Sequence, residues 1–249
     1  KTMKLCLPRA NPFPVNAWFD YSCTLTFALP KEEIAARLPN CLTPDTFDDQ
    51  WGFVAVAVVQ TRHLRPAGFP AFLGHDFVLV GYRYFVRYRS ASGRNLRGLY
   101  ILRSETDKKK MVLLGNLFTR YRYVATGVNV TDLDESLYIT SAQTGLEIAV
   151  DLHNDGTLPA DSPFSHWKDA RKFSGPLPFT FTCEPKKNRV LIVEGVRSSW
   201  KPRLVNVSHH HIPFLAELGH DNAILANAFV VNHIPYHWKK GTVEPWPNP

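Results

Sequence analysis

The sequence predicts a predominantly antiparallel α+β fold, and three observations indicate this fold class. Side chains alternate strictly from Val80 to Arg89, which is the period of a β-strand. Two pairs of apolar runs are separated by short turn segments, as in β-hairpins. Only a few short stretches carry helix signals. At 249 residues the chain can bury a full core, and we expect one domain over residues 1–249.

The first half of the chain contains one helix signal and two strand signals. Pro30–Pro39 has proline and acidic residues in its first turn and proline at its end, so it predicts a short helix. Trp51–Gln60 is rich in valine and apolar on both faces, which predicts a central strand. The prolines and glycines of His63–Gly74 predict a surface loop. In the strand Val80–Arg89, one face carries Tyr82, Tyr84, Val86 and Tyr88, and the other carries Arg83, Phe85, Arg87 and Arg89.

The middle of the chain predicts a strand, a helix and a further strand. Leu96–Leu102 reads as a strand, and Ser104–Asp107 has the spacing of a capping box that opens a helix to about Phe118. Thr119–Val124 alternates between tyrosine and arginine and predicts the next strand.

The second half of the chain predicts two hairpins and a closing strand. The hairpins pair Ser136–Ser141 with Leu146–Leu152 and Phe179–Cys183 with Val190–Val196. A short helix is expected over Ile212–Gly219, a strand over Ala223–His233, and an irregular coil after Trp238.

Basic residues are concentrated in one segment of the chain. The whole chain has a formal net charge of +7, but residues 83–122 contain eleven Lys and Arg against Glu105 and Asp107, a local charge of +9. Such an excess attracts anions, either a carboxylate metabolite or a polyanion.

The cysteines and the apolar runs indicate the compartment. Cys6, Cys23, Cys41 and Cys183 are widely spaced, which is typical of free thiols in a reducing environment. The longest apolar run, Trp51 to Val59, is too short to cross a bilayer, and a signal-type start is lacking. We therefore expect a cytoplasmic protein without a membrane partner.

The sequence lacks the usual nucleotide, zinc-hydrolase and serine-hydrolase motifs, so we expect no cofactor and no metal. His209 and His211 would share one face of an extended segment and could bind a metal with a nearby histidine, but surface or capping roles are favoured because no carboxylate or cysteine stands at ligand spacing. An activated amine within Lys108–Lys110 is conceivable, yet the first turn of a helix favours solvated lysines.

The alternating tyrosine and arginine strands allow three interpretations. They could line a pocket with tyrosines and place arginines at its rim, or they could form an aromatic and basic platform for single-stranded nucleic acid. They could also simply bury an aromatic face and expose arginines to solvent. An RNP-type motif is lacking, so we do not expect nucleic acid as a partner.

Several segments together resemble a known family. They are Trp18–Tyr21, Leu38–Asp48, the Pro66–Pro70 loop, Gly175–Phe181 and Val193–Trp200. In this order they resemble the YqjF-like family of uncharacterised proteins, a branch of the acetoacetate decarboxylase-like superfamily, over roughly residues 10 to 235.

This resemblance implies a curved, cone-like β barrel that encloses one apolar pocket, with a few short helices beside it. It also implies that the imine-forming lysine of acetoacetate decarboxylases is replaced. An ungapped match places Arg122 at that position, and a slip of one residue would place Tyr121 or Tyr123 there. The acidic partner expected after Phe53 is replaced by Val54. We therefore expect no classical imine-forming decarboxylase.

The sequence favours an enzyme that acts on a keto acid or a polyketide-type intermediate by lyase, hydrolase or cyclisation chemistry, as in secondary metabolism, without a metal. The alternative is a non-catalytic protein that binds an apolar anionic metabolite. The expected partner is a small carbonyl- or carboxylate-bearing molecule, and a homo-oligomer remains open.

The residues that we expect at the site come from strands and strand ends that this fold would bring around one pocket. Glu105 is a candidate acid or base, although helix capping is its favoured role. The catalytic candidates are Arg122, Tyr121, Tyr123 and Glu105, and the substrate-binding candidates are Tyr82, Tyr84 and Arg103.

Overall fold

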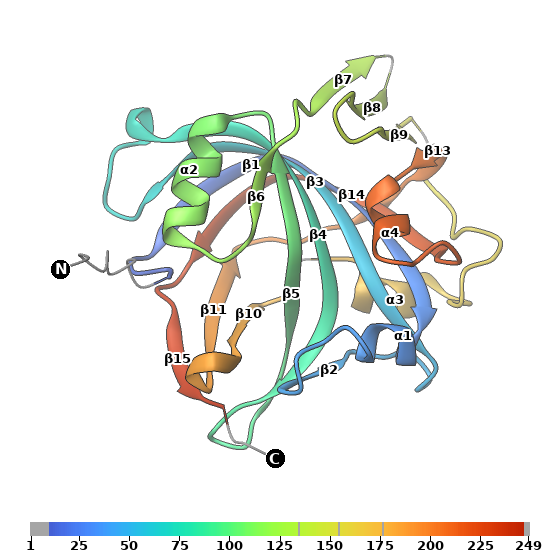
Figure 1. Cartoon of the computed structure of the whole chain (residues 1–249). Helices are drawn as coiled ribbons and strands as arrows, with labels where there is room; N and C mark the ends of the chain where they lie inside the picture. The colour runs from blue at the N-terminus through green and yellow to red at the C-terminus, as the bar shows by residue number, and fades with distance from the viewer. Residues whose placement is uncertain (1–9, 134, 154, 176, 247–249) are drawn as a thin grey trace.

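The computed structural model describes residues 10–133, 135–153, 155–175 and 177–246, which form two β-sheets with short helices around them (Figure 1). The larger sheet contains β1 (Val15–Pro30), β2 (Leu42–Pro44), β3 (Trp51–Pro66), β4 (His75–Arg89), β5 (Asn95–Thr106), β6 (Tyr123–Ala125), β10 (Phe179–Glu184), β11 (Arg189–Arg197), β12 (Arg203–Leu204), β14 (Ile224–Trp238) and β15 (Thr242–Pro245). The smaller sheet contains β7 (Asn129–Leu133), β8 (Ser136–Ser141), β9 (Leu146–Asp151) and β13 (Asn206–His211). The helices are α1 (Lys31–Ala35), α2 (Lys109–Phe118), α3 (Trp167–Ala170) and α4 (Pro213–Glu217), with 3₁₀ turns η1 (Ala71–Leu73), η2 (Arg171–Phe173) and η3 (Pro185–Lys187).

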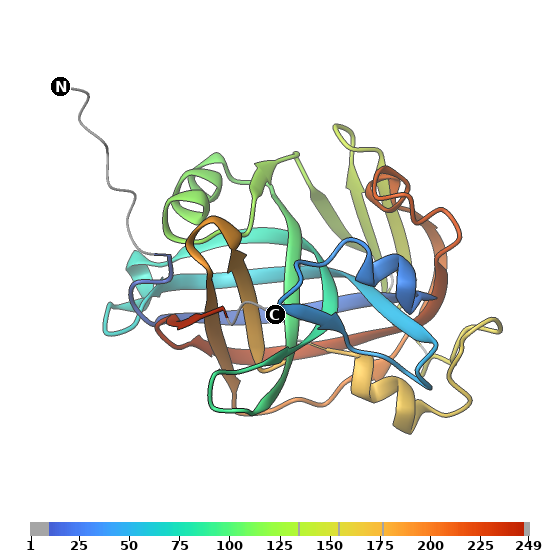
Figure 2. The ribbon, with the colours of Figure 1, turned by 60° about the horizontal axis from the view of Figure 1, so that its bottom comes forward.

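The larger sheet closes on itself as a barrel (Figure 2). Its strands follow the order β14, β1, β3, β4, β5, β10 and β11, and β11 then pairs with β14. Neighbouring strands in this ring are antiparallel except β5 and β10, which run parallel. The β10–β11 hairpin is joined to the ring by three residue pairs to β5 and three to β14. This architecture confirms the predicted curved, mainly antiparallel sheet with few short helices.

The smaller sheet and α4 cover part of the outer face of the barrel. Ile139 and Ile148 from the smaller sheet, and Leu215 from α4, belong to one buried cluster with Val56 and Tyr82 of the barrel. The predicted hairpins are present as β8–β9 and β10–β11. The outward sides of the long strands therefore form a second apolar core between the two sheets.

Strand β4 shows how the two faces of the barrel differ. Its tyrosines point into the outer core, whereas Gly81 and Arg83 face the interior of the barrel. A β-bulge follows Tyr82, so that Tyr82 pairs with Arg103 while Arg83 pairs with Ile101. The bulge gives β5 one extra residue, which keeps the apolar side chain of Ile101 on the inner face opposite Arg83.

Several element boundaries differ from the predicted ones. The predicted capping box at Ser104–Asp107 is not present, because β5 continues to Thr106 in register with Leu79 and α2 begins at Lys109 without a side-chain cap. Asp107 instead accepts a hydrogen bond from the Val78 amide at 2.9 Å, which extends the contact between β4 and β5. These residues therefore pair with strand β4 and do not cap a helix.

Two predicted irregular segments contain strand structure. The first third of the predicted loop His63–Gly74 belongs to β3, whose last residue, Pro66, pairs with Val15 at the end of the ladder. The segment after Trp238 was predicted as coil, but Thr242–Pro245 forms β15 and pairs with β11. Proline ends both strands, where a missing backbone donor is tolerated.

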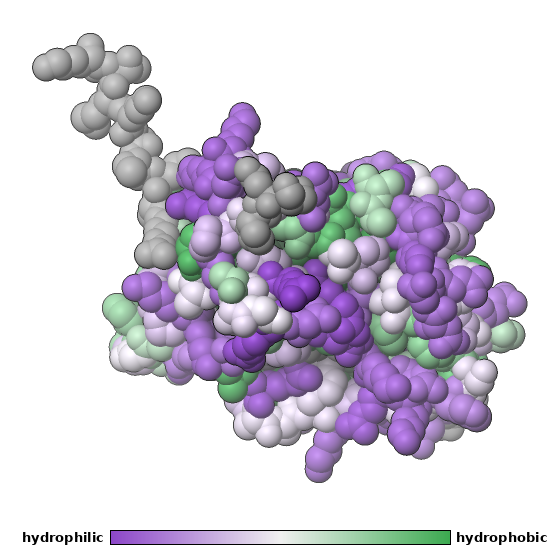
Figure 3. All heavy atoms as spheres, turned by 90° about the horizontal axis from the view of Figure 1, so that it is seen from below, coloured by the Kyte–Doolittle hydropathy of each residue, from purple (hydrophilic) through white to green (hydrophobic). Residues whose placement is uncertain are grey.

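Part of the basic segment is neutralised within the fold. Asp45 is fully buried at the end of β2 and accepts a hydrogen bond from the Arg87 Nε at 2.7 Å and another from the Arg97 Nε. Figure 3 shows that hydrophilic residues cover most of the face seen from below, and hydrophobic residues form small separate areas. Among the described residues, no helix is long and apolar enough to span a bilayer.

Replacing Asp45 tests the importance of this buried ion pair. We expect Asp45→Ala to lower the free energy of unfolding by about 3 kcal/mol, because two guanidinium groups lose their common acceptor. Urea unfolding followed by tryptophan fluorescence measures this change. The matched control is Glu194→Ala, which removes a surface ion pair with Lys239 and should change stability far less. Equal effects of the two substitutions would contradict the assigned role of Asp45.

Candidate active site inside the barrel

The interior of the barrel contains a cavity of about 110 Å³. Its wall is formed by residues from β1, β3, β4, β5, β10 and β14, and by the segment that precedes β6. An aromatic cluster closes the barrel below it, where the ring of Phe53 lies 4.4 Å from that of Phe173 and 5.3 Å from that of Phe164. The cavity has room for a few water-sized groups, at ~30 Å³ per water in the liquid, and so suits a small molecule.

Arg83 is the cation of this cavity. Its guanidinium folds back over Gly81, where an added Cβ would lie 3.0 Å from Nη2. The Nε atom is buried and has no hydrogen-bond partner among the described residues. Burial lowers the pKa of Arg83 to about 10, and the nearby Tyr236 and Tyr123 oppose this shift. Arg83 is therefore still charged at neutral pH.

None of the described residues that line the cavity is Asp, Glu, Lys or His. A buried charge without a counterion is costly, and proteins usually pair such a group or use it. The cavity thus has a net positive charge and lacks an internal acid that could neutralise it. An anion of matching size would supply the missing partner.

Three tyrosines line the same cavity. Burial raises the pKa of Tyr123 to about 12, although the charge of Arg83 opposes this, and burial also raises the pKa values of Tyr121 and Tyr236. All three phenols are therefore protonated at neutral pH and can donate hydrogen bonds. The Tyr121 hydroxyl is buried near Asn11 and Thr180 but makes no hydrogen bond of normal geometry.

The segment that carries Tyr121 and Tyr123 is held by helix α2. The Asn116 side chain accepts a hydrogen bond from the Tyr123 amide at 2.8 Å and donates one to the Tyr123 carbonyl at 2.9 Å. The hydroxyl of Thr119 donates to the Gly115 carbonyl at 2.7 Å and accepts from the Tyr121 amide at 3.2 Å. These bonds fix the backbone on both sides of residue 122.

Arg122 adopts a left-handed backbone conformation, with φ of 54°. Only Tyr123–Ala125 forms a strand, β6, so the first part of the strand predicted over Thr119–Val124 is irregular instead. Gly115 allows this arrangement, because a Cβ there would collide with the ring of Tyr123. Tyr121 and Tyr123, on either side of this residue, line the same cavity, whereas Arg122 lines an outer hollow.

The structure separates the seven predicted site residues into groups. Tyr121 and Tyr123 line the cavity, whereas Arg122 lines a separate outer hollow with Arg120 and Cys183. This separation agrees with the alternation of tyrosine and arginine in the sequence.

Tyr82, Arg103 and Glu105 lie together on the outer face. The Arg103 guanidinium contacts the fully buried Glu105 carboxylate at 2.5 Å, and its Cζ lies 6.0 Å from the centroid of the Tyr82 ring. Glu105 accepts a hydrogen bond from Thr126 and does not cap a helix, contrary to the favoured expectation. Burial raises the pKa of Tyr82, and the Glu105 charge adds to this.

Tyr84 is also on the outer face, under α1 and α4. Its hydroxyl lies 2.6 Å from the Nε2 of His220, which is itself buried. Burial lowers the pKa of His220, and the charge of Arg37 adds to this shift while Glu33 opposes it. His220 is therefore neutral at pH 7.

Arg83 was not predicted as a site residue, because all arginines on this face of β4 were expected to lie either at the rim of a pocket or in solvent. Strand alternation places Arg83 and Arg87 on the same side, but closure of the barrel makes the first internal and leaves the second at the rim beside Asp45. A usable signal was present in the small neighbours Gly81 and Ala55, which flank Arg83 on the same face and leave space for its side chain.

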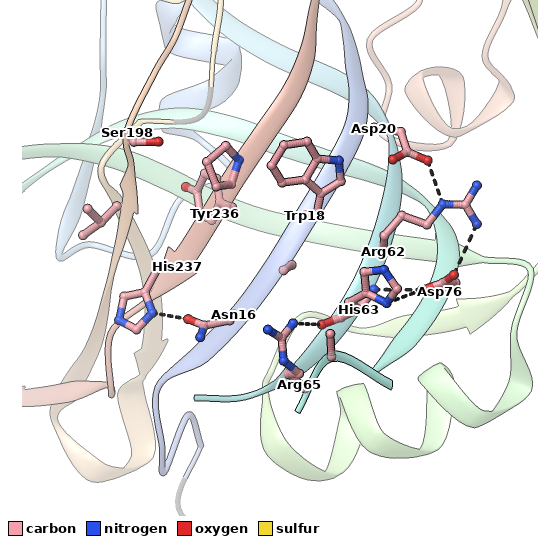
Figure 4. Close-up of a pocket in the computed structure, with 14 residues that line it drawn as sticks. Asn16, Trp18, Asp20, Arg62, His63, Arg65, Asp76, Ser198, Tyr236 and His237 are labelled. Carbon is pink, nitrogen blue, oxygen red and sulfur yellow. Dashed lines mark hydrogen bonds and ion pairs between the residues drawn. The ribbon is translucent and has the colours of Figure 1, made fainter. Parts of the chain in front are cut away.

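A larger, open groove of about 840 Å³ lies on the outside of β14, β1 and β3 (Figure 4). Its two arginines have partners within the chain, and Arg65 donates to the carbonyls of His63 and Phe69. Arg62 donates to Asp20 at 2.7 Å and to Asp76 at 3.3 Å, and His237 lies 2.5 Å from the Asn16 side chain. The arginines of this groove therefore differ from Arg83, whose buried Nε has no hydrogen-bond partner among the described residues.

The histidines singled out in the sequence do not gather around a metal. His209 to His211 are exposed on β13, where His209 contacts Glu147 at 3.3 Å. Among the described residues, no group of three or more His, Cys, Asp or Glu side chains has an arrangement that could hold a metal ion.

Comparison of the sequence with known families gives one match. Residues 17–219 match the DUF2071 family, described as an uncharacterized conserved protein. No curated protein gives a significant match. Both findings leave the chemistry of the relatives unstated.

Solved structures with this fold include three informative ones. An acetoacetate decarboxylase-like enzyme from Sphingomonas wittichii RW1 is 14% identical, with 93% of each chain covered and a TM-score of 0.58. Acetoacetate decarboxylase from Legionella pneumophila subsp. pneumophila str. Philadelphia 1 is 12% identical, with 97% of this chain and 93% of that chain covered and a TM-score of 0.56. The enduracididine biosynthesis enzyme MppR, complexed with pyruvate, is 11% identical, with coverage of 93% and 90% and a TM-score of 0.54. At these identities the likeness shows the fold alone.

Replacing Asn116 tests how the tyrosine segment is held. We expect Asn116→Ala to accelerate hydrogen exchange over residues 119–124 and to lower stability by about 1–2 kcal/mol, because two hydrogen bonds to Tyr123 are lost. Exchange measured by mass spectrometry reports both effects. Asn129→Ala, on the exposed strand β7, is the control and should leave exchange at 119–124 unchanged. Unaltered exchange in Asn116→Ala would refute this role.

Buried His220 predicts a specific acid sensitivity. Its pKa in the folded chain lies below the ordinary 6.5, so the unfolded chain binds the proton more readily. Its contribution to stability is therefore present above pH 6.5 and is lost as pH falls through the lower folded value. We expect His220→Gln to reduce the difference in unfolding free energy between pH 7.5 and pH 5. An undiminished difference would mean that other groups cause the acid sensitivity.

Proposed function

Because the chain belongs to the DUF2071 family and has an acetoacetate decarboxylase-like fold, we propose that it is an enzyme that acts on a small keto acid inside the barrel. The narrower assignment to a YqjF-like group is part of this proposal, as are a polyketide-type substrate and lyase, hydrolase or cyclisation chemistry. One observation carries the proposal. The guanidinium of Arg83 faces a cavity whose described lining residues include no acid.

Arg83 would bind the carboxylate of the keto acid. Two parallel N–H donors match the two oxygens of a carboxylate, and this pairing gains strength where water is excluded. The apolar residues of the wall, such as Leu79, Leu99 and Ile101, would contact the carbon chain. The expected ligand is therefore a small monoanion with an apolar body.

Tyr121 and Tyr123 would act on the keto group. A protonated phenol can donate a hydrogen bond to a carbonyl oxygen and stabilise the enolate that forms when a neighbouring bond breaks. The raised pKa values keep these phenols protonated near pH 7. No lysine is among the described lining residues, so this chemistry does not involve an imine with the cavity wall.

The second candidate is a protein that binds such an anion without converting it. It is favoured by the lack of carboxylate and histidine among the described residues of the wall, because most proton transfers in enzymes use these groups. Saturable binding without turnover would support this second candidate.

Replacing Arg83 separates binding from stability. We expect Arg83→Met to weaken pyruvate or acetoacetate binding about 30-fold or more, because the carboxylate loses its charged partner. The same substitution should raise the unfolding free energy of the free protein by about 1 kcal/mol, because it removes a buried charge without a counterion. Isothermal titration calorimetry and urea unfolding measure the two effects.

Two further variants make the Arg83 test specific. Arg94→Met changes an exposed arginine in the β4–β5 turn and should leave both quantities unchanged. Arg122→Met tests the position indicated by sequence matching. If Arg122→Met abolished binding while Arg83→Met did not, the carboxylate site would lie in the outer hollow and not in the barrel.

Replacing each tyrosine tests turnover. If the protein is an enzyme, Tyr121→Phe or Tyr123→Phe should lower kcat about 100-fold or more with a smaller change in KM, because a phenol acts mainly in the transition state. Proton NMR of a keto-acid panel measures turnover. Borohydride treatment with the same panel should give no lysine adduct. Equal rates in wild type and both variants would exclude the tyrosines from the chemistry.

A further inference from the structure

Two cysteines from distant parts of the chain meet on the outside of the barrel. Cys41 immediately precedes β2, which pairs with β4 through Leu42 and Tyr88. Cys183 is in β10, which pairs with β5 through Phe181 and Tyr100. The two thiols lie close enough to influence each other's pKa, and the rings of Tyr88 and Phe181, from the strands that hold them, pack with centroids 5.4 Å apart.

Solvent has access to this pair. Both cysteines are only partly buried, in contrast to the fully buried Cys23. Cys183 lines an open hollow of about 320 Å³ together with Arg120 and Arg122. The site is therefore reachable by a small polar reagent, and its two guanidinium groups favour negative charge near the thiols.

The two thiols differ in acidity. The neighbouring Cys183 lowers the pKa of Cys41, and this effect outweighs the opposing effect of burial. The neighbouring Cys41 raises the pKa of Cys183, and burial adds to that rise. Cys41 is therefore the more readily deprotonated of the two thiols. This division matches the attacking and resolving roles of a dithiol.

We propose that Cys41 and Cys183 form a redox-reactive pair that a small hydroperoxide converts into a disulfide between the segment before β2 and β10. The Cys41 thiolate attacks one peroxide oxygen, the O–O bond breaks, and protonation of the leaving oxygen releases water or an alcohol. Cys41 is then a sulfenic acid. The Cys183 sulfur displaces its hydroxyl group and loses a proton, which releases water and forms the S–S bond. The two sulfurs together lose two electrons, and the peroxide gains them.

The disulfide would cross-link strands that are not hydrogen-bonded to each other. β2 is attached to β4, whereas β10 lies beyond β5, so the bond would span two strands of the ring. Cys183 lies in the same strand, β10, as Thr180, and Thr180 lines the interior cavity. The modification therefore acts close to the cavity, but it does not depend on the proposed function of the cavity.

The test uses the wild-type protein, reduced and then treated with a small excess of hydrogen peroxide. Free thiols are alkylated under denaturing conditions, and the intact mass and peptide map are measured. We expect the loss of two hydrogen masses and one peptide pair that contains Cys41 and Cys183. The oxidised protein should also melt roughly 5 to 15 °C higher, because a long loop is closed in the unfolded chain. Reduction with dithiothreitol should restore the original mass.

Variants assign the roles of the two sulfurs. Cys183→Ser should accumulate a sulfenic acid on Cys41 that dimedone labels, whereas Cys41→Ser should form neither a disulfide nor a dimedone adduct at Cys183. Cys23→Ser is the matched control and should oxidise like wild type, because Cys23 is buried and burial raises its pKa to about 12. A reduced Cys41 and Cys183 after treatment, or a disulfide that links either one to Cys6 or to a second molecule, would overturn the proposal.

Discussion

The charge of Arg83 inside a closed barrel is the constraint on which the site depends. A closed ring of strands shields its centre from bulk water, and a guanidinium in such a place is usually paired with an acid or a bound anion. The same chain shows the alternative at its rim, where Arg87 and Arg97 share the buried carboxylate of Asp45. The protein therefore supplies counterions where arginine has a structural role. It leaves one charge unpaired at the position where the barrel has internal space.

Several features of the fold hold Arg83 and the tyrosines of the cavity in place. Gly81 leaves room for the guanidinium, and the bulge after Tyr82 sets an apolar residue of β5 opposite it. Helix α2 holds the segment that carries two of the tyrosines through Asn116 and Thr119. Each of these is a backbone or packing device, and none depends on a ligand. The cavity is thus formed in the folded chain before anything enters it, which reduces the entropy lost on binding.

Strand periodicity was sufficient to predict the sheet from the sequence, and it also identified both hairpins and the two faces of β4. It could not predict which face is internal, because alternation describes a strand locally while curvature arises from the pairing of β11 with β14, distant in sequence. Tyr121 and Tyr123 were proposed through family resemblance, and they line the cavity. Arg122 points away from them, as the alternation of tyrosine and arginine predicts, but its left-handed backbone angle was not predicted from the residue pattern. The predicted capping box at Ser104–Asp107 is absent, because pairing with β4 extends β5 to Thr106.

The attachment of the β10–β11 hairpin has a consequence for how the barrel exchanges its contents. Three residue pairs hold it to β5 and three to β14, whereas β1 is paired with both of its neighbours along nearly its whole length. Detaching the hairpin breaks fewer backbone hydrogen bonds than separating β1 from either neighbour, so local opening costs less free energy there. Thr180 of this hairpin is part of the cavity wall. The hairpin is therefore the part of the ring that we expect to open at the least cost, and its opening would expose the cavity wall at Thr180.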